Sequence, residues 1–233
     1  MKAITSSIIL LFLLAGCSPE DTLSEIHANE QSAYLKKGAA SPSHPANPFD
    51  HIGSIYSNLA ASYYAIPHHN VTLELVISEG EALLMQDKAF LALLKNEAYT
   101  PITAEEIYSY IEVESDLSAL LDDRYGPKAL EIYDSITITL GPLLQADAPY
   151  SDIRAALILI EDLALASEEL PQAEREAILT TSSIMRNALS KGGKPRRRDR
   201  DWEWMIGNIA ATANAALDSK PQAIMACFAT DVY

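Results

Sequence analysis

Prolines divide the chain from residue 48 onward into segments of helix length, and this spacing constrains the fold more than any other feature. Proline is tolerated in the first turn of a helix and breaks its interior, so these positions are natural helix boundaries. They are residues 48, 67, 101, 127, 142, 149, 171, 195 and 221. Within the segments, apolar residues recur every three or four positions, as on one face of a helix. The clearest run is Ile52, Ile55, Leu59, Tyr63 and Ile66.

Two stretches hold enough β-branched residues to compete as strands, residues 71–77 and 132–140. Strand pairing would need turn residues, and the chain has only nine glycines and no Asn-Gly or Asp-Gly pair. We therefore predict an all-α fold, a single globular bundle of about seven to eight helices. Residues 151–165 are apolar nearly all round and are expected to form the central buried helix.

Local motifs also predict where individual helices begin and end. Asn47-Pro48 is expected to cap the first helix and to place proline in its first turn. Residues 103–106, Thr-Ala-Glu-Glu, have the spacing of a capping box. Gly192-Gly193 is expected to end the helix that opens at Pro171.

The first sixteen residues are organised like a secretory signal peptide. Lys2 is followed by an apolar run from Ile8 to Leu14. That run is too short for a membrane span, which needs about 20 apolar residues. Residues 14–17, Leu-Ala-Gly-Cys, resemble the lipobox of bacterial lipoproteins, in which the cysteine is acylated and the signal is removed before it. The resemblance implies that Cys17 is a lipid anchor in a membrane, not half of a disulfide, since each buried CH₂ contributes about 0.8 kcal/mol.

The residues that follow Cys17 predict its sorting and the length of its tether. In Gram-negative lipoproteins an Asp at the next position retains the protein at the inner membrane, so Ser18 favours the outer membrane. The periplasmic and surface faces both remain open. Residues 17–47 are expected to be the lipidated cysteine and a flexible tether of about 30 Å. The predicted organisation is therefore a signal peptide at 1–16, the tether at 17–47 and the all-α domain at 48–233.

Six basic residues within ten positions form the clearest charge anomaly in an acidic chain. Without Lys2 the chain has 16 basic and 32 acidic residues, a net charge of −16. One hypothesis is an exposed loop that satisfies neighbouring acidic faces; the other is a contact for a lipid headgroup, an anionic glycan or an acidic protein. The export signal and the negative total exclude nucleic acid as a partner. The six residues are Lys191, Lys194, Arg196, Arg197, Arg198 and Arg200.

The sequence contains no motif from which a catalytic residue, a metal site or a cofactor is predicted. Among the histidines, one alternative is a metal site built across elements from Asp50, His51 and His68. Among the acidic pairs, Glu161 and Asp162 are the candidates for glycoside hydrolysis, because an apolar helix would desolvate them. The competing interpretation is that both point outward or pair with a nearby arginine, Arg154.

The C-terminal part contains two further candidates, Cys227 and Trp202. Cys227 is expected to be a small buried residue in a C-terminal helix, next to Ile224 and Phe228. An intermolecular disulfide and a reactive thiol are the alternatives. Trp202 could stack on a sugar, but one aromatic residue per turn is ordinary in a core.

The two ends of the predicted domain resemble a group of uncharacterised bacterial lipoproteins. These open their mature domain with Asn-Pro-aromatic-acid, here residues 47–50, and close it with an alanine-rich helix containing Trp, here residues 202–217. The resemblance implies an all-helical lipoprotein and no particular chemistry. The sequence thus favours a membrane-anchored binding or envelope-interaction module over an enzyme, without deciding between them. The alternatives are a helical hydrolase acting on envelope glycan or peptide through paired carboxylates, and a structural spacer.

Overall fold

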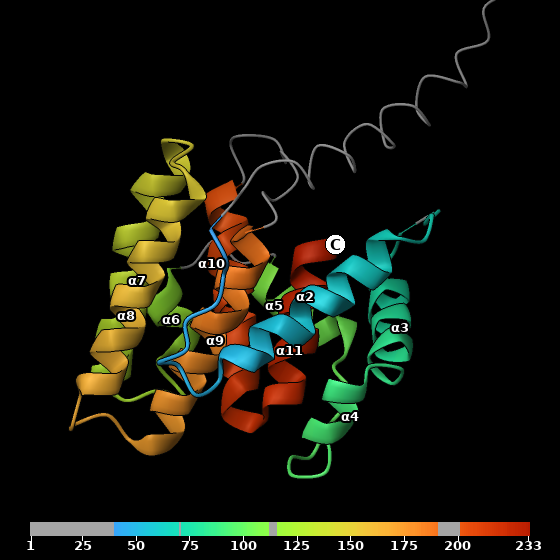
Figure 1. The fold of residues 1–233 in the computed structure, drawn as a ribbon, viewed down its shortest axis with the longest axis horizontal. Coiled ribbons are helices and arrows are strands. Elements are labelled where there is room, and N and C mark those ends of the chain that lie inside the picture. Colours follow the sequence, from blue (N-terminus) through green and yellow to red (C-terminus); the bar gives the residue numbers. More distant parts are fainter. Residues whose placement is uncertain (1–39, 70, 112–115, 191–200) are drawn as a thin grey trace, which may run out of the picture. The chain divides into compact units, whose positions relative to one another are not determined.

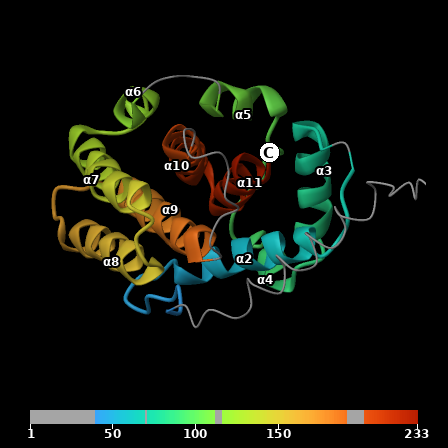
Figure 2. The same cartoon turned by 90° about the horizontal axis from the view of Figure 1, so that it is seen from above.

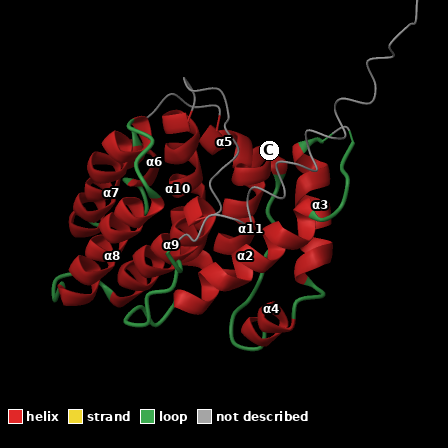
Figure 3. Ribbon diagram, turned by 45° about the horizontal axis from the view of Figure 1, so that its top comes forward, coloured by secondary structure: helices red, strands yellow, loops and turns green. Residues whose placement is uncertain are grey.

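The computed structural model describes residues 40–69, 71–111, 116–190 and 201–233, without the side chains of 201–203. Every regular element in these ranges is a helix, which confirms the predicted all-α class (Figures 1 and 3). The described residues belong to one compact unit. The ten helices are α2 (Asp50–Tyr64), α3 (Leu73–Leu84), α4 (Lys88–Leu93), α5 (Ala104–Ile111), α6 (Leu117–Leu121), α7 (Pro127–Gln145), α8 (Tyr150–Ala166), α9 (Gln172–Ser190), α10 (Asp201–Asp218) and α11 (Lys220–Val232). In this part of the chain, no helix has both the length and the apolar character needed to cross a bilayer.

Both stretches that might have formed strands are helical, because local capping and packing favour the helix there. Residues 73–77 open α3, where Thr72 Oγ1 accepts a hydrogen bond from Leu75 N at 3.3 Å. Residues 132–140 lie inside α7 and place three of their β-branched or aromatic side chains in the core. These three are Ile132, Tyr133 and Ile136.

Of the two helix starts predicted from capping motifs, the one at Thr103 is confirmed and the one at Asn47-Pro48 differs from the structure. The predicted capping box is confirmed, since Thr103 N donates to Glu106 Oε2 at 2.7 Å and Glu106 N donates to Thr103 Oγ1 at 3.2 Å. The first helix instead begins at Asp50, two residues later than Asn47-Pro48 predicts. Asn47 builds the preceding turn, because its Oδ1 accepts from the backbone N–H of Phe49 at 2.8 Å.

Proline 142 does not end a helix, contrary to its predicted role as a boundary. Helix α7 continues through it to Gln145. The carbonyl that loses its helical donor belongs to Ile138, whose side chain is 73% exposed. Because this position faces solvent, water can replace the missing donor at small cost.

The most buried helices are α9 and α11, so the prediction that residues 151–165 form the central helix is wrong. Every residue of α9 from 177 to 188 is buried, as is every residue of α11 from 223 to 230. Figure 2 shows α9, α10 and α11 at the centre, with the other helices around them. Helix α8 is one of these surrounding helices, and its outer face exposes Leu159 by 59% and Leu163 by 50%.

Helices α2 and α9 cross in close contact, and Gly53 permits their approach. A Cβ at this position would lie 2.2 Å from Asn187 Nδ2 and 2.3 Å from Ser183 O. At the crossing, Gly53 N donates to Ser183 Oγ at 3.1 Å, and that hydroxyl donates to Asp50 O at 3.0 Å. The crossing therefore positions the start of α2 against the middle of α9.

Candidate functional site

Four charged or titratable side chains from four segments meet beside the α2–α9 crossing. We call His44, Asp50, Glu161 and Arg186 the charge cluster. Arg186 on α9 and Glu161 on α8 are both 0% exposed. Arg186 Nε donates to Glu161 Oε1 at 2.9 Å, and Arg186 Nη2 donates to Asp50 Oδ1 at 2.7 Å. One guanidinium thus joins α2, α8 and α9.

His44 brings the segment that precedes α2 into the charge cluster. Its Nδ1 is hydrogen-bonded to Glu161 Oε2, so both oxygens of this buried carboxylate are engaged. Its Nε2 lies 3.9 Å from Asp162 Oδ1, and its side chain is 13% exposed. Its backbone N–H donates to Asp50 Oδ1 at 3.0 Å.

Asp50 is the most heavily hydrogen-bonded carboxylate of the charge cluster. Burial alone would raise its pKa. The opposing effects are larger, since hydrogen bonds from Arg186, Ser43 and the His44 backbone, together with the Arg186 charge, lower the pKa below its ordinary value of 3.8. The bond from Ser43 Oγ to Asp50 Oδ2 is 2.8 Å long. Asp50 therefore remains ionised across the physiological range.

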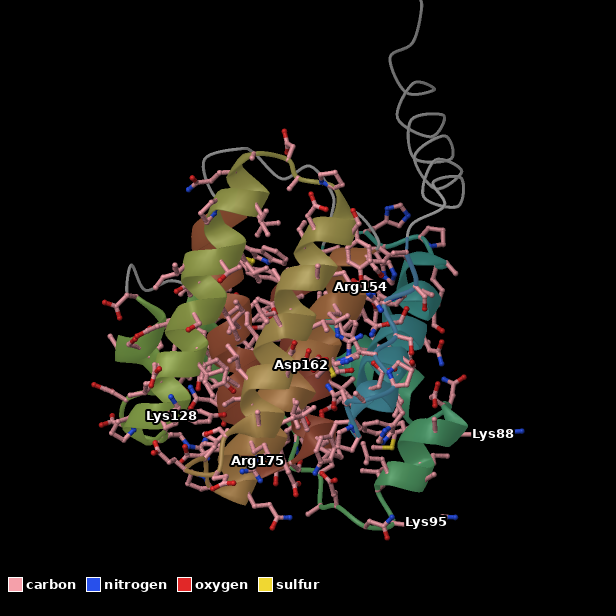
Figure 4. The ribbon with its side chains drawn as sticks, turned by 60° about the vertical axis from the view of Figure 1, so that its left-hand side comes forward. Lys88, Lys95, Lys128, Arg154, Asp162 and Arg175 are labelled. Atoms are coloured by element: carbon pink, nitrogen blue, oxygen red, sulfur yellow. The ribbon has the colours of Figure 1, made fainter. Side chains whose placement is uncertain are left out.

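Arg154 on α8 holds the same segment by its backbone. Its Nε donates to Ser41 O at 2.7 Å and its Nη2 donates to Ser43 O at 2.6 Å. Figure 4 shows Arg154 and Asp162 on α8, the helix against which residues 40–49 lie. One interpretation of the sequence had Glu161 and Asp162 either pointing outward or pairing with Arg154. The structure does not show that pairing, because the guanidinium of Arg154 binds backbone carbonyls instead.

The expected end of the tether at residue 47 differs from the structure, which packs residues 40–47 onto the helices. Asn47 is 2% exposed, and its Nδ2 donates to Leu179 O on α9 at 2.9 Å. With the bonds of Ser41, Ser43 and His44, this contact makes the segment part of the folded unit. The reason is that polar groups of α8 and α9, remote in sequence, supply its hydrogen-bond partners.

Tyr150 also contacts Arg186, and one nitrogen of the Arg186 guanidinium has no partner in the described part of the chain. Tyr150 OH donates to the backbone carbonyl of Arg186 at 2.8 Å, and burial raises the pKa of Tyr150 to about 12. Arg186 Nη1 is buried and has no hydrogen-bond partner among the described residues. The guanidinium therefore has its charge balanced by two carboxylates, while one of its N–H groups is left over.

Glu161 and Asp162 are not arranged as a catalytic pair. Glu161 is directed at Arg186 and His44, whereas the side chain of Asp162 is 56% exposed. Hydrolysis by two carboxylates requires that they flank one bond of the substrate. These two adjacent groups leave α8 in different directions, one into the core and one toward solvent.

The remaining predicted site residues have separate outcomes. Cys227 is 0% exposed in α11, as predicted, and its Sγ donates to Asn208 Oδ1 at 3.2 Å. Burial strongly raises the pKa of this thiol. The basic residues of 191–200, Cys17 and the side chain of Trp202 lie outside what the structure describes.

His51 and His68, the two histidines of the alternative metal site, lie apart in the structure. His51 is exposed on α2. His68 lies 2.9 Å from Glu79 Oε2 through Nδ1 and 2.7 Å from Tyr63 O through Nε2. Within the described ranges, no group of three His, Cys, Asp or Glu side chains is arranged to hold a metal ion.

The hollows on the described surface include two that lie next to titratable side chains. One, of about 360 Å³, lies next to Ser118 and Asp134, which are hydrogen-bonded to each other. The other, of about 190 Å³, lies next to His68 and Glu79. Glu161 and Arg186 line neither hollow. The contacts of the charge cluster join the segment before α2 to three helices.

Comparison with known proteins adds no relative to this picture. No family model, curated protein or solved structure matches the chain. The function is therefore argued from the residues themselves.

Proposed function

We propose that the chain is a bacterial outer-membrane lipoprotein whose tethered helical domain is a binding or envelope-interaction module. The lipobox-like sequence that ends at Cys17 provides the anchor. The observation that carries the proposal is the charge cluster, which fastens the chain directly after the tether to α2, α8 and α9. These bonds give the domain a defined attachment to the chain that leads from its anchor.

The geometry of the charge cluster favours the module over the hydrolase. Both oxygens of Glu161 are engaged, and the residue is 0% exposed. A general acid or base must reach the substrate within hydrogen-bond distance. Glu161 therefore serves packing and charge pairing, and the acidic pair that the sequence favoured does not support an active site.

Anchoring can be tested by labelling cells with radioactive palmitate and separating their membranes. We expect the wild-type protein to be labelled and to sediment with the outer membrane, because acyl chains on Cys17 insert into the bilayer. The Cys17→Ser variant should be unlabelled and should stay out of the membrane fraction. Wild-type protein without label would contradict the proposal.

The same cells can show which face of the membrane carries the domain. We expect intact cells treated with an external protease to lose the domain if it is on the surface. Protection until the outer membrane is broken would place the domain in the periplasm. The first result directs the search toward extracellular partners, and the second toward peptidoglycan and envelope assembly.

The basic residues between α9 and α10 are the candidate contact of this module. We propose that they bind anionic groups, such as lipid phosphates, an anionic glycan or an acidic protein. Each basic residue near an anionic surface contributes about 1 kcal/mol. Replacing three of them with Ser, Arg196, Arg197 and Arg198, should therefore weaken binding by about 3 kcal/mol, or on the order of 100-fold, at low salt.

Vesicles that contain anionic lipid provide the assay, using chains that begin at residue 18 so that acyl groups do not mask the effect. A matched control replaces three other basic residues, Lys88, Lys95 and Lys128, with Ser; all three are labelled in Figure 4. Both variants lose three positive charges. If both variants bind equally weakly, or if the arginine variant binds as tightly as the wild type, the proposed contact is wrong and the basic residues form only a solvated loop.

A further inference from the structure

The charges of the four groups in the charge cluster sum to zero only when the ring of His44 carries a proton. Asp50 and Glu161 contribute two negative charges and Arg186 contributes one positive charge. A net charge left inside a protein is costly, and Glu161 is 0% exposed. A protonated imidazole at His44 supplies the missing positive charge next to Glu161.

The groups around His44 favour the charged ring from both sides. On α8, Glu161 contacts Nδ1 and Asp162 faces Nε2 at 3.9 Å. On α2, Asp50 accepts the backbone N–H of His44. Neither neighbouring cation contacts the ring of His44. Arg186 on α9 binds Asp50 and the other oxygen of Glu161, Oε1. Arg154 on α8 binds the carbonyls of Ser41 and Ser43. The ring nitrogens therefore face carboxylates, which a neutral imidazole can satisfy only in part.

We propose that His44 is a protonation-dependent latch that holds residues 40–47 against α2 and α8. When the ring is charged, it completes the charge cluster and the segment is closed. When the ring loses its proton, the bond to Glu161 weakens and the charge cluster is left with a net negative charge, so the segment opens. Imidazole is the side chain that most readily exchanges a proton near neutral pH, so pH is the variable that tests the latch.

The opening is local, because the helices keep their own contacts. Arg186 still pairs with Asp50 and Glu161, and the α2–α9 crossing at Gly53 is unaffected. The latch itself depends only on described residues. Its consequence for the anchored protein rests on the proposed function: eight released residues, each spanning at most about 3.4 Å, would lengthen the tether.

Hydrogen exchange measured by mass spectrometry on the full chain in detergent tests the latch. The informative amides are those of His44, which donates to Asp50, and Asn47, which donates to His44 O at 2.9 Å. The peptide covering residues 41–50 is compared at about pH 5 and about pH 8, on either side of the imidazole range, after correction for intrinsic exchange rates. The variants are His44→Gln and, as a matched control, His51→Gln at an exposed histidine.

We expect the protection of this peptide in the wild type and in His51→Gln to fall on the order of tenfold from the acidic to the alkaline condition. In His44→Gln the peptide should be weakly protected at both, while α9 and α11 stay protected and so report a folded chain. Equal protection of the wild type at both conditions, or a pH dependence that persists in His44→Gln, would overturn the proposal.

A second measurement reads the ring directly, so that the test does not depend on how the variant folds. Nitrogen chemical shifts of the wild-type His44 ring should report an imidazolium at about pH 5 and a neutral imidazole at about pH 8. A ring that stays in one form at both conditions would refute the latch. Palmitate labelling of Cys17 is independent of these readouts, so failure of the latch and failure of the proposed anchoring can be told apart.

Discussion

Replacing Arg186 with Met should strongly destabilise the domain, because it leaves buried negative charge without its main counterion. Glu161 is 0% exposed and would keep only His44, and the Asp50 side chain, 20% exposed, would lose its cation. Breaking a buried ion pair by removing one partner costs about 3–5 kcal/mol. For a domain of this size, each kcal/mol lowers Tm by roughly 2–4 °C, so we expect a fall of about 6–20 °C.

A second change should recover part of that loss. In the variant Arg186→Met with Glu161→Gln, the fully buried carboxylate no longer carries a charge, while the amide oxygen can still accept a hydrogen bond from His44. Replacing both members of a buried pair is often close to neutral, whereas replacing one is not. We therefore expect the paired variant to be more stable than Arg186→Met alone, by roughly half of the original loss.

Urea unfolding followed by circular dichroism measures these free energies of unfolding. The control is Arg124→Met, which removes a surface pair with Asp218 in which the side chains are 39% and 47% exposed. Exposed pairs contribute about 0–1 kcal/mol. The reasoning is refuted if Arg186→Met costs no more than Arg124→Met, or if the paired variant is no more stable than the single one.

Three further predictions concern packing, pH and thiol reactivity. Gly53→Ala should cost about 1–3 kcal/mol in urea unfolding, because the new Cβ meets Asn187 Nδ2 at 2.2 Å and Ser183 O at 2.3 Å; no loss would contradict the close crossing. Because the pKa of Asp50 is lower in the folded chain, its ionised form stabilises the fold above the ordinary value of 3.8 and this contribution is lost as the pH falls. The stability difference between wild type and Asp50→Asn should therefore be largest near neutral pH and should shrink in acid; a constant difference would argue against this role. Burial raises the pKa of Cys227, so a thiol reagent should modify it only after unfolding, and rapid labelling of the native chain would be the contrary result.

Helix class and several helix ends could be predicted because they depend on neighbours in sequence. Pro127 and Pro221 stand in the first turns of α7 and α11, as the proline spacing indicates. The Thr103 capping box forms within four residues. The burial of each helix could not be predicted in this way, because it depends on which helices pack beside it. Thus α8 is rich in apolar residues yet peripheral, whereas α9 buries Thr180 and Ser183.

The charge cluster joins residues that are far apart in sequence, so local patterns could not reveal it. His44 and Glu161 are separated by 117 positions, and Asp50 and Arg186 by 136. One usable signal was present: Glu161 has apolar residues three and four positions away on its helix, such as Leu157 and Ala164. A charge in such a place needs a partner, although the sequence does not show which basic residue supplies it. Nothing comparable marks His44, which lies in a segment with the composition of a linker.

The mass of the N-terminal peptide, measured on protein purified from bacterial membranes, tests the central claim most directly. The account predicts a chain that begins at Cys17, carries acyl groups on that residue and lacks residues 1–16. A chain that keeps residues 1–16, or one that begins elsewhere with no acyl group, would contradict it.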